Sequence, residues 1–251
     1  MPRLIVTRPA RQAAAWLGQL AARGVDVIAL PLIEIGAGDG AALAAGWAGL
    51  AGQRLVVFVS VNAVDAFFAA RPAGAGWPEG LAAAAPGPGT AAALRAAGVA
   101  AALVVEPDAD AAPADSEALW QRLRERDLAG ASVLIVRGDT GREWLGEQLA
   151  GAGATVAHVA AYARTPARLS AAERATVGDA ADRPEAHVWL FSSAEAIDHL
   201  EAGFPGRWAA ARAIATHPRI AARARAAGFA RVLEAAPDLD AVVACIQSLR
   251  P

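Results

Sequence analysis

The chain has 251 residues, of which 55% are hydrophobic and 19% charged, and its formal net charge is −2. This apolar content is sufficient for the cores of two domains and excludes a disordered chain, while the near-neutral charge argues against a nucleic-acid-binding surface. All 23 basic residues are arginine, which excludes Schiff-base chemistry on lysine, attachment of pyridoxal phosphate and the lysine of a phosphate-binding loop.

Short apolar runs alternate with alanine-rich amphipathic stretches, which is the pattern of βα units and parallel sheets. In chain order, the sequence predicts strands at 3–7, 25–30, 55–59, 103–105, 132–136, 155–159, 187–191, 212–215 and 231–233. It predicts helices at 10–22, 62–69, 90–97, 116–126, 142–151, 194–201 and 218–227. Glycine or proline breaks this pattern from Glu34 to Gly40 and from Arg164 to Arg168.

Three blocks of sequence occur twice. Residues 4–6 and 16–21 return as 134–136 and 144–150, residues 58–65 return as 191–198, and residues 95–98 return as 225–228. The offset is roughly 130 residues, half of the chain, which indicates a duplicated unit, since solenoid repeats are about 20–50 residues long. Two similar lobes form one cleft, and small ligands usually bind in such clefts.

The repeat allows two divisions of the chain. One division cuts the chain once, near Gly130. The other follows the two breaks, so that the chain crosses between lobes at 36–40 and at 164–167. In that case residues 1–35 and 168–251 form a discontinuous first lobe, and residues 41–163 form the second. Periodicity alone does not choose between them.

Small polar residues follow the predicted strands, where the next helices begin. In parallel α/β sheets ligands bind at this edge, and the free N–H groups of helix starts favour anions. The alternative for each loop is ordinary helix capping. Because the set recurs in both halves, we favour binding of a polycarboxylate or a phosphate ester, with these candidate residues: Ser60, Asn62, Gly89, Thr90, Gly138, Ser192, Ser193, Thr216 and His217.

Tyr162, the only tyrosine, is the candidate catalytic residue, because a phenol can transfer a proton to a leaving hydroxyl. The alternative is an aromatic ring that packs at the lobe junction. No histidine has the spacing of a metal ligand, so we expect no metal site. Cys245 is the only cysteine, and its apolar neighbours predict a buried core position. Without a signal peptide or a membrane-spanning run, the sequence predicts a cytoplasmic protein.

The order and spacing of nine motifs resemble the uroporphyrinogen-III synthase family over essentially the whole chain. The matching residues lie at 6–9 (VTRP), 30–35, 58–64 (FVSVNAV), 87–90 (GPGT), 115–119, 134–142, 162–164, 191–193 and 215–221 (ATHPRIA). The resemblance implies two flavodoxin-like α/β lobes with parallel sheets, joined by a two-stranded connector. It also implies a first lobe built from both chain ends, which favours the double crossing.

The resemblance further implies a cyclising hydro-lyase of haem biosynthesis. Its substrate would be hydroxymethylbilane, a linear tetrapyrrole polycarboxylate, which closes to uroporphyrinogen III with inversion of the terminal pyrrole ring. No metal or organic cofactor, nucleic acid or membrane is implied, and members are usually monomeric. The alternatives from the residues alone are a non-catalytic two-lobed binder of an anionic metabolite and an enzyme that acts on a phosphosugar.

The resemblance also assigns roles to single residues. Tyr162 matches the tyrosine that would help the hydroxyl group to depart. The positions expected to bind substrate carboxylates are Ser60, Thr90, Ser193 and Thr216. Val59 stands where many members have threonine or serine, so a hydroxyl group at that position is not essential here.

Overall fold

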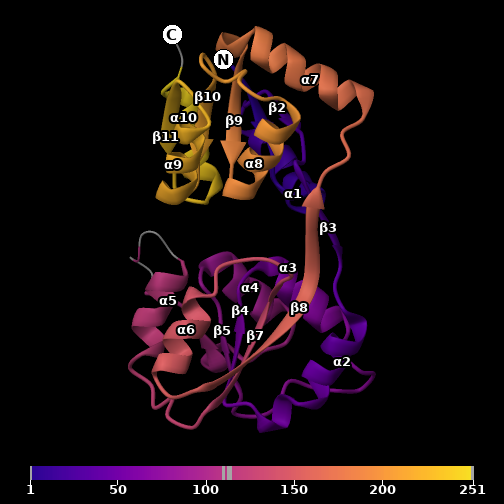
Figure 1. Cartoon of the computed structure of the whole chain (residues 1–251), viewed down its shortest axis with the longest axis vertical. Helices are drawn as coiled ribbons and strands as arrows, with labels where there is room; N and C mark the ends of the chain where they lie inside the picture. Colours follow the sequence, from indigo (N-terminus) through magenta and orange to yellow (C-terminus); the bar gives the residue numbers. More distant parts are fainter. Residues whose placement is uncertain (1, 109–110, 112–114, 250–251) are drawn as a thin grey trace. The chain divides into compact units, whose positions relative to one another are not determined.

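The structure, a computed structural model, describes residues 2–108, 111 and 115–249. It divides into two compact units, of which the first comprises Met1–Glu34 and Thr165–Pro251 and the second Ile35–Arg164. In Figure 1 the first unit therefore combines the indigo and the orange-to-yellow ends of the colour scale. The two chain ends are held together because strand β1 (Arg3–Val6) pairs with strand β9 (His187–Phe191).

The first unit is a five-stranded parallel sheet in the order β11-β10-β9-β1-β2. The other strands are β2 (Val27–Ala29), β10 (Arg212–Ala215) and β11 (Arg231–Glu234). Its helices are α1 (Ala10–Ala22), α7 (Ala171–Asp182), α8 (Ala194–Gly203), α9 (Pro218–Ala226) and α10 (Leu239–Gln247). Successive side chains of a strand face opposite sides. Accordingly Leu190 packs in the core with α1 and α10, while Trp189 and Phe191 contact the rings of Trp208 and Phe229.

The second unit holds a six-stranded sheet in the order β3-β8-β7-β4-β5-β6. Its strands are β3 (Ile33–Ala37), β4 (Leu55–Phe58), β5 (Ala82–Ala84), β6 (Val104–Val105), β7 (Ser132–Gly138) and β8 (Thr155–Pro166). Its helices are α2 (Gly40–Ala48), α3 (Val61–Ala69), α4 (Pro88–Ala96), α5 (Ser116–Leu123) and α6 (Trp144–Gly151). Two apolar clusters cover opposite faces, one around Phe58 and Phe67 and the other around Val57 and Leu119.

All nine predicted strands and seven predicted helices are present, with ends displaced by a few residues. The sequence did not predict β3, β5, α2, α7 and α10. Strand β5 consists of three alanines, which have little preference for strands. Helix α7 lacks a continuous apolar stripe, which is the usual signal of a helix on a core. Cys245 is only partly buried, which corrects the expectation of a core position.

The two predicted breaks overlap the ends of two neighbouring strands, β3 and β8, which cross the unit boundary. Gly36 lies beside Ala163 and Gly38 beside Ala161, so the two strands run antiparallel, unlike the parallel pairs of the other strands. A Cβ atom on Gly38 would overlap the backbone of Ala161. Gly38 is therefore required for the close approach of the strands and not for a turn.

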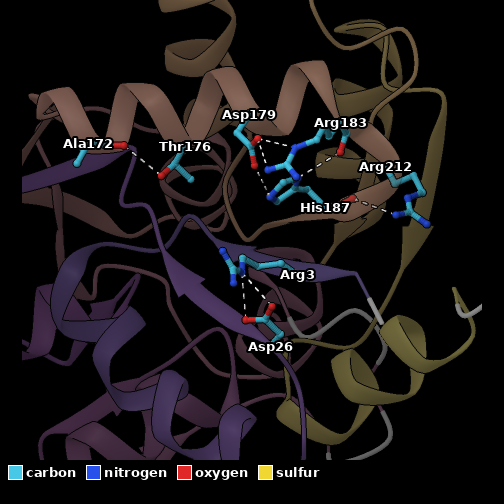
Figure 2. Close-up of polar contacts among 8 residues, drawn as sticks. All are labelled: Arg3, Asp26, Ala172, Thr176, Asp179, Arg183, His187 and Arg212. Carbon is cyan, nitrogen blue, oxygen red and sulfur yellow. Dashed lines mark hydrogen bonds and ion pairs between the residues drawn. The ribbon is translucent and has the colours of Figure 1, made fainter.

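Helix α7 is attached to β9 through a buried histidine. The His187 residue is 4% exposed. Its Nδ1 atom lies 3.2 Å from the carbonyl oxygen of Arg183, and its Nε2 atom lies 3.3 Å from a carboxylate oxygen of Asp179 (Figure 2). Both neighbours only accept hydrogen bonds, so each contact uses a ring nitrogen of His187 as the donor.

We expect Gly38→Ala to lower the free energy of unfolding by at least about 3 kcal/mol, the upper end of the usual range for overpacking. The added methyl group must displace the backbone of β8. Urea denaturation measures this change. The matched control is Gly40→Ala, where a Cβ atom meets no atom within 4 Å. Equal effects of the two substitutions would contradict the close packing of β3 against β8.

We expect Asp179→Ala to lower the free energy of unfolding by about 1–3 kcal/mol, because it leaves a buried nitrogen of His187 without an acceptor. The control is Arg183→Ala, which removes the exposed partner of the same carboxylate and should cost less than about 1 kcal/mol. Thermal or urea unfolding compares the two variants. If both lose the same stability, the histidine contact is not the important one.

Candidate functional site

In the first unit, the strand register brings the predicted polar loops to one edge of the sheet. Val6 of β1 is level with Leu190 of β9, and Phe191 is level with Ala215 of β10. The residues that follow these three strands therefore leave the sheet at the same end. This arrangement gathers four of the predicted residues, namely Ser192, Ser193, Thr216 and His217.

Their local roles differ. Ser193 is the N-cap residue of α8, but its side chain makes no capping hydrogen bond. His217 caps α9, because its Nδ1 atom accepts a hydrogen bond of 3.0 Å from the backbone N–H of Arg219. Thr216 is 8% exposed, while Ser192 is half-buried. Helix capping therefore accounts for the position of His217 and not for that of Ser193.

In the second unit, the predicted residues also follow neighbouring strands. Ser60 caps α3, since its Oγ atom accepts a hydrogen bond of 3.2 Å from Ala63 N–H. Asn62 lies in the first turn of that helix, and Gly89 and Thr90 lie in the first turn of α4. Because β4 pairs with both β5 and β7, the strand order places the start of α3 between the end of β7 and the start of α4.

Tyr162 joins this group from β8. The residue is 1% exposed and packs in the apolar cluster of the second unit. Its hydroxyl oxygen lies 3.0 Å from Ser60 Oγ and accepts a hydrogen bond of 3.0 Å from an Nη atom of Arg164. A Cβ atom on Gly138 would be 3.0 Å from the Tyr162 ring, so the glycine provides the space that the ring occupies.

In these contacts the O–H group of Tyr162 can act as a hydrogen-bond donor. A guanidinium group only donates hydrogen bonds, so the Tyr162 oxygen is the acceptor from Arg164. The phenol can then donate its proton either to Ser60 Oγ or to a bound ligand. This geometry suits an acid that protonates a departing group.

A cavity of about 240 Å³ lies in the second unit beside Tyr162, with arginines in its lining. An Nη atom of Arg137 is 2.6 Å from a carboxylate oxygen of Glu143, and this contact lowers the pKa of Glu143. Arg142 donates two hydrogen bonds, of 2.6 and 2.9 Å, to Glu117, which raise the pKa of Arg142. Three arginines, Arg137, Arg142 and Arg164, line the cavity, and the first two are paired with carboxylates. An anion in the cavity would therefore not face three uncompensated positive charges.

The residue-by-residue prediction did not include these arginines. Arg137 and Arg142 lie at the two ends of the predicted loop 137–142, from which the candidate residues include Gly138 alone. The positive charge at both ends of this loop is the sequence feature that indicates them. Arg164 belongs to the predicted break and to the motif at 162–164, but neither assigns it a role. Within residues 2–108, 111 and 115–249, no group of three or more His, Cys, Asp and Glu side chains could hold a metal ion. No described helix is long and apolar enough to cross a membrane.

Comparisons with known proteins agree on one family. The family model described as uroporphyrinogen-III synthase HemD matches residues 14–244. Among solved structures, a mutant uroporphyrinogen III synthase from Thermus thermophilus has 18% identity and a TM-score of 0.65, and the match covers 99% of this chain and 97% of that one. Uroporphyrinogen-III synthetase from Helicobacter pylori has 17% identity and a TM-score of 0.62, and all of both chains is covered. No curated protein matches the chain.

The two structures share the fold of this chain, with mixed α/β units built on two sheets. The family model covers most of the chain, including both strand-end groups of polar residues and Tyr162. The chain belongs to the uroporphyrinogen-III synthase family, and it is a cyclising lyase of tetrapyrrole biosynthesis.

Proposed function

We propose that Tyr162 protonates the hydroxyl group of hydroxymethylbilane as that group departs as water. The contact of the Tyr162 oxygen with Arg164 and Ser60 carries this assignment. After water is lost, the terminal pyrrole ring is inverted through a spiro intermediate, and the macrocycle closes as uroporphyrinogen III. The protein then has to hold the rest of the substrate still, and positioning of this kind can contribute several kcal/mol.

The strand-end residues of each unit bind the carboxylates of the substrate in this proposal. Those of the second unit are Ser60, Asn62, Gly89, Thr90 and Gly138, and those of the first are Ser192, Ser193, Thr216 and His217. Gly89 is exposed, and a Cβ atom there would meet no atom within 4 Å, so a ligand group can approach the start of α4. Since Nδ1 of His217 accepts the capping bond, the neutral ring carries its proton on Nε2, where it can be donated.

We also propose that residues 1–35 with 168–251 and residues 41–163 act as the two lobes of a cytoplasmic monomer. The two compact units of the structure support the two lobes, and a net charge of −2 argues against nucleic acid as a partner. Sedimentation velocity of the purified protein tests the monomer, and a concentration-dependent increase in sedimentation coefficient would count against it.

We expect the purified protein to convert freshly generated hydroxymethylbilane into the type III isomer of uroporphyrinogen. Without an enzyme the linear substrate closes to the symmetric type I isomer, so the isomer ratio reports catalysis directly. Chromatography of the oxidised products at several protein concentrations measures this ratio. Type I product alone, at every concentration, would remove the proposal and would favour a non-catalytic binder or a phosphosugar enzyme.

We expect Tyr162→Phe to lower kcat by about 10- to 100-fold, with little change in product binding. General acid catalysis typically contributes about 100-fold or more, so this is a small effect of that kind. The ring and its packing remain, and only the proton donor is lost. Steady-state kinetics and titration with uroporphyrin separate the two effects.

Ser60→Ala is the matched control, because it removes the same hydrogen bond and leaves the phenol in place. We expect this variant to lose about 1 kcal/mol of stability, as is typical for a lost N-cap, and to retain most of kcat. Its KM should rise, because Ser60 is also a proposed carboxylate-binding residue. If Tyr162→Phe keeps the wild-type kcat, Tyr162 serves packing alone.

A further inference from the structure

Among residues 2–108, 111 and 115–249, no carboxylate pairs with Arg8, a cation at the strand ends of the first unit. It follows β1 by two residues, and its guanidinium carbon lies 3.8 Å from the centroid of the Trp16 ring. The Nε atom is buried and makes no hydrogen bond. Burial lowers the pKa of Arg8 to about 10, and no carboxylate of the described residues contributes to this shift.

This arrangement opposes folding at neutral pH. A pKa that is lower in the folded chain than in the unfolded chain means that the fold disfavours the charged form. The Trp16 ring offsets part of this cost through a cation–π contact. Arg3, on the same strand, is instead paired with Asp26 at 3.0 Å. A charge that the fold tolerates without a partner is expected where function requires it.

The strand register places Arg8 in a row with two predicted substrate-binding residues. Val6 pairs with Leu190, so Arg8 and Ser192 each lie two positions further along. Ala215 pairs with Phe191, so Thr216 and Ser192 each lie one position further along. Neighbouring strands are about 4.8 Å apart, so one carboxylate can contact members of this row together. Arg8 also keeps part of its surface exposed, although its Nε atom is buried.

We propose that Arg8 binds a carboxylate of the linear tetrapyrrole, which supplies the negative charge that the fold does not provide. The proposal rests on the function proposed above. A guanidinium group presents several donors in a plane and can hold a carboxylate by two parallel hydrogen bonds. The hydroxyl groups of Ser192 and Thr216 add donors beside it. Arg8 contacts the substrate far from any bond that breaks, so it affects binding and not the chemical step.

The test is Arg8→Gln, which keeps a polar side chain and removes the charge. We expect KM for hydroxymethylbilane and Kd for uroporphyrin to rise about tenfold or more, as for a lost hydrogen bond to a charged group, while kcat changes less than about twofold. The midpoint of urea unfolding should stay the same or rise, since an unpaired buried charge is removed. Arg8→Lys, which keeps the charge, should give a KM between those of the wild type and Arg8→Gln.

Arg3→Gln is the matched control, because it removes an arginine from the other end of the same strand. It should leave KM unchanged. If the wild type forms no type III isomer, the proposed function fails. If the wild type forms it and Arg8→Gln keeps the wild-type KM and Kd, only the proposal for Arg8 is overturned. An Arg8→Gln variant that unfolds, or unfolds at lower urea, also overturns it, because Arg8 would then serve packing on Trp16.

Discussion

The register of parallel strands is the constraint on which both candidate groups of residues depend. In the first unit β1, β9 and β10 end level with one another, and in the second unit β4 ends beside β5 and β7. Every helix that follows these strands begins at the same edge, with free backbone N–H groups. Short polar loops gather at that edge because the sheet aligns them, and no loop would achieve this alone.

Tyr162 shows how the sheet of the second unit places a hydroxyl group within an apolar core. The ladder between β7 and β8 shifts its register between Arg137 and Gly138, so that Gly138 pairs with Tyr162. The missing side chain of Gly138 leaves room for the ring, and the ring directs its hydroxyl group to Ser60 and Arg164. Burial of the residue, which is 1% exposed, holds the ring between these contacts.

Charge is arranged differently at the two strand-end edges. Around the cavity of the second unit, Arg137 and Arg142 are held by Glu143 and Glu117. In the first unit, the contact of Arg8 among the described residues is with an aromatic ring and not with a carboxylate. Because all the basic residues are arginine, every cationic side chain of this kind is planar and remains charged at neutral pH.

The sequence alone determined those elements whose signal is local: the predicted strands and helices with clear periodicity, the duplication, and the polar residues after each strand. Order and spacing of motifs also determined the family. Only the tertiary structure decided that the alanines of β5 form a strand and that Gly38 lies against β8. Tyr162 and Ser60 are in contact although they are 102 positions apart in the sequence. The sequence around Arg8 likewise does not indicate whether a carboxylate lies beside it in the fold. Such contacts depend on which strands pair, and pairing between distant segments leaves no mark in local periodicity.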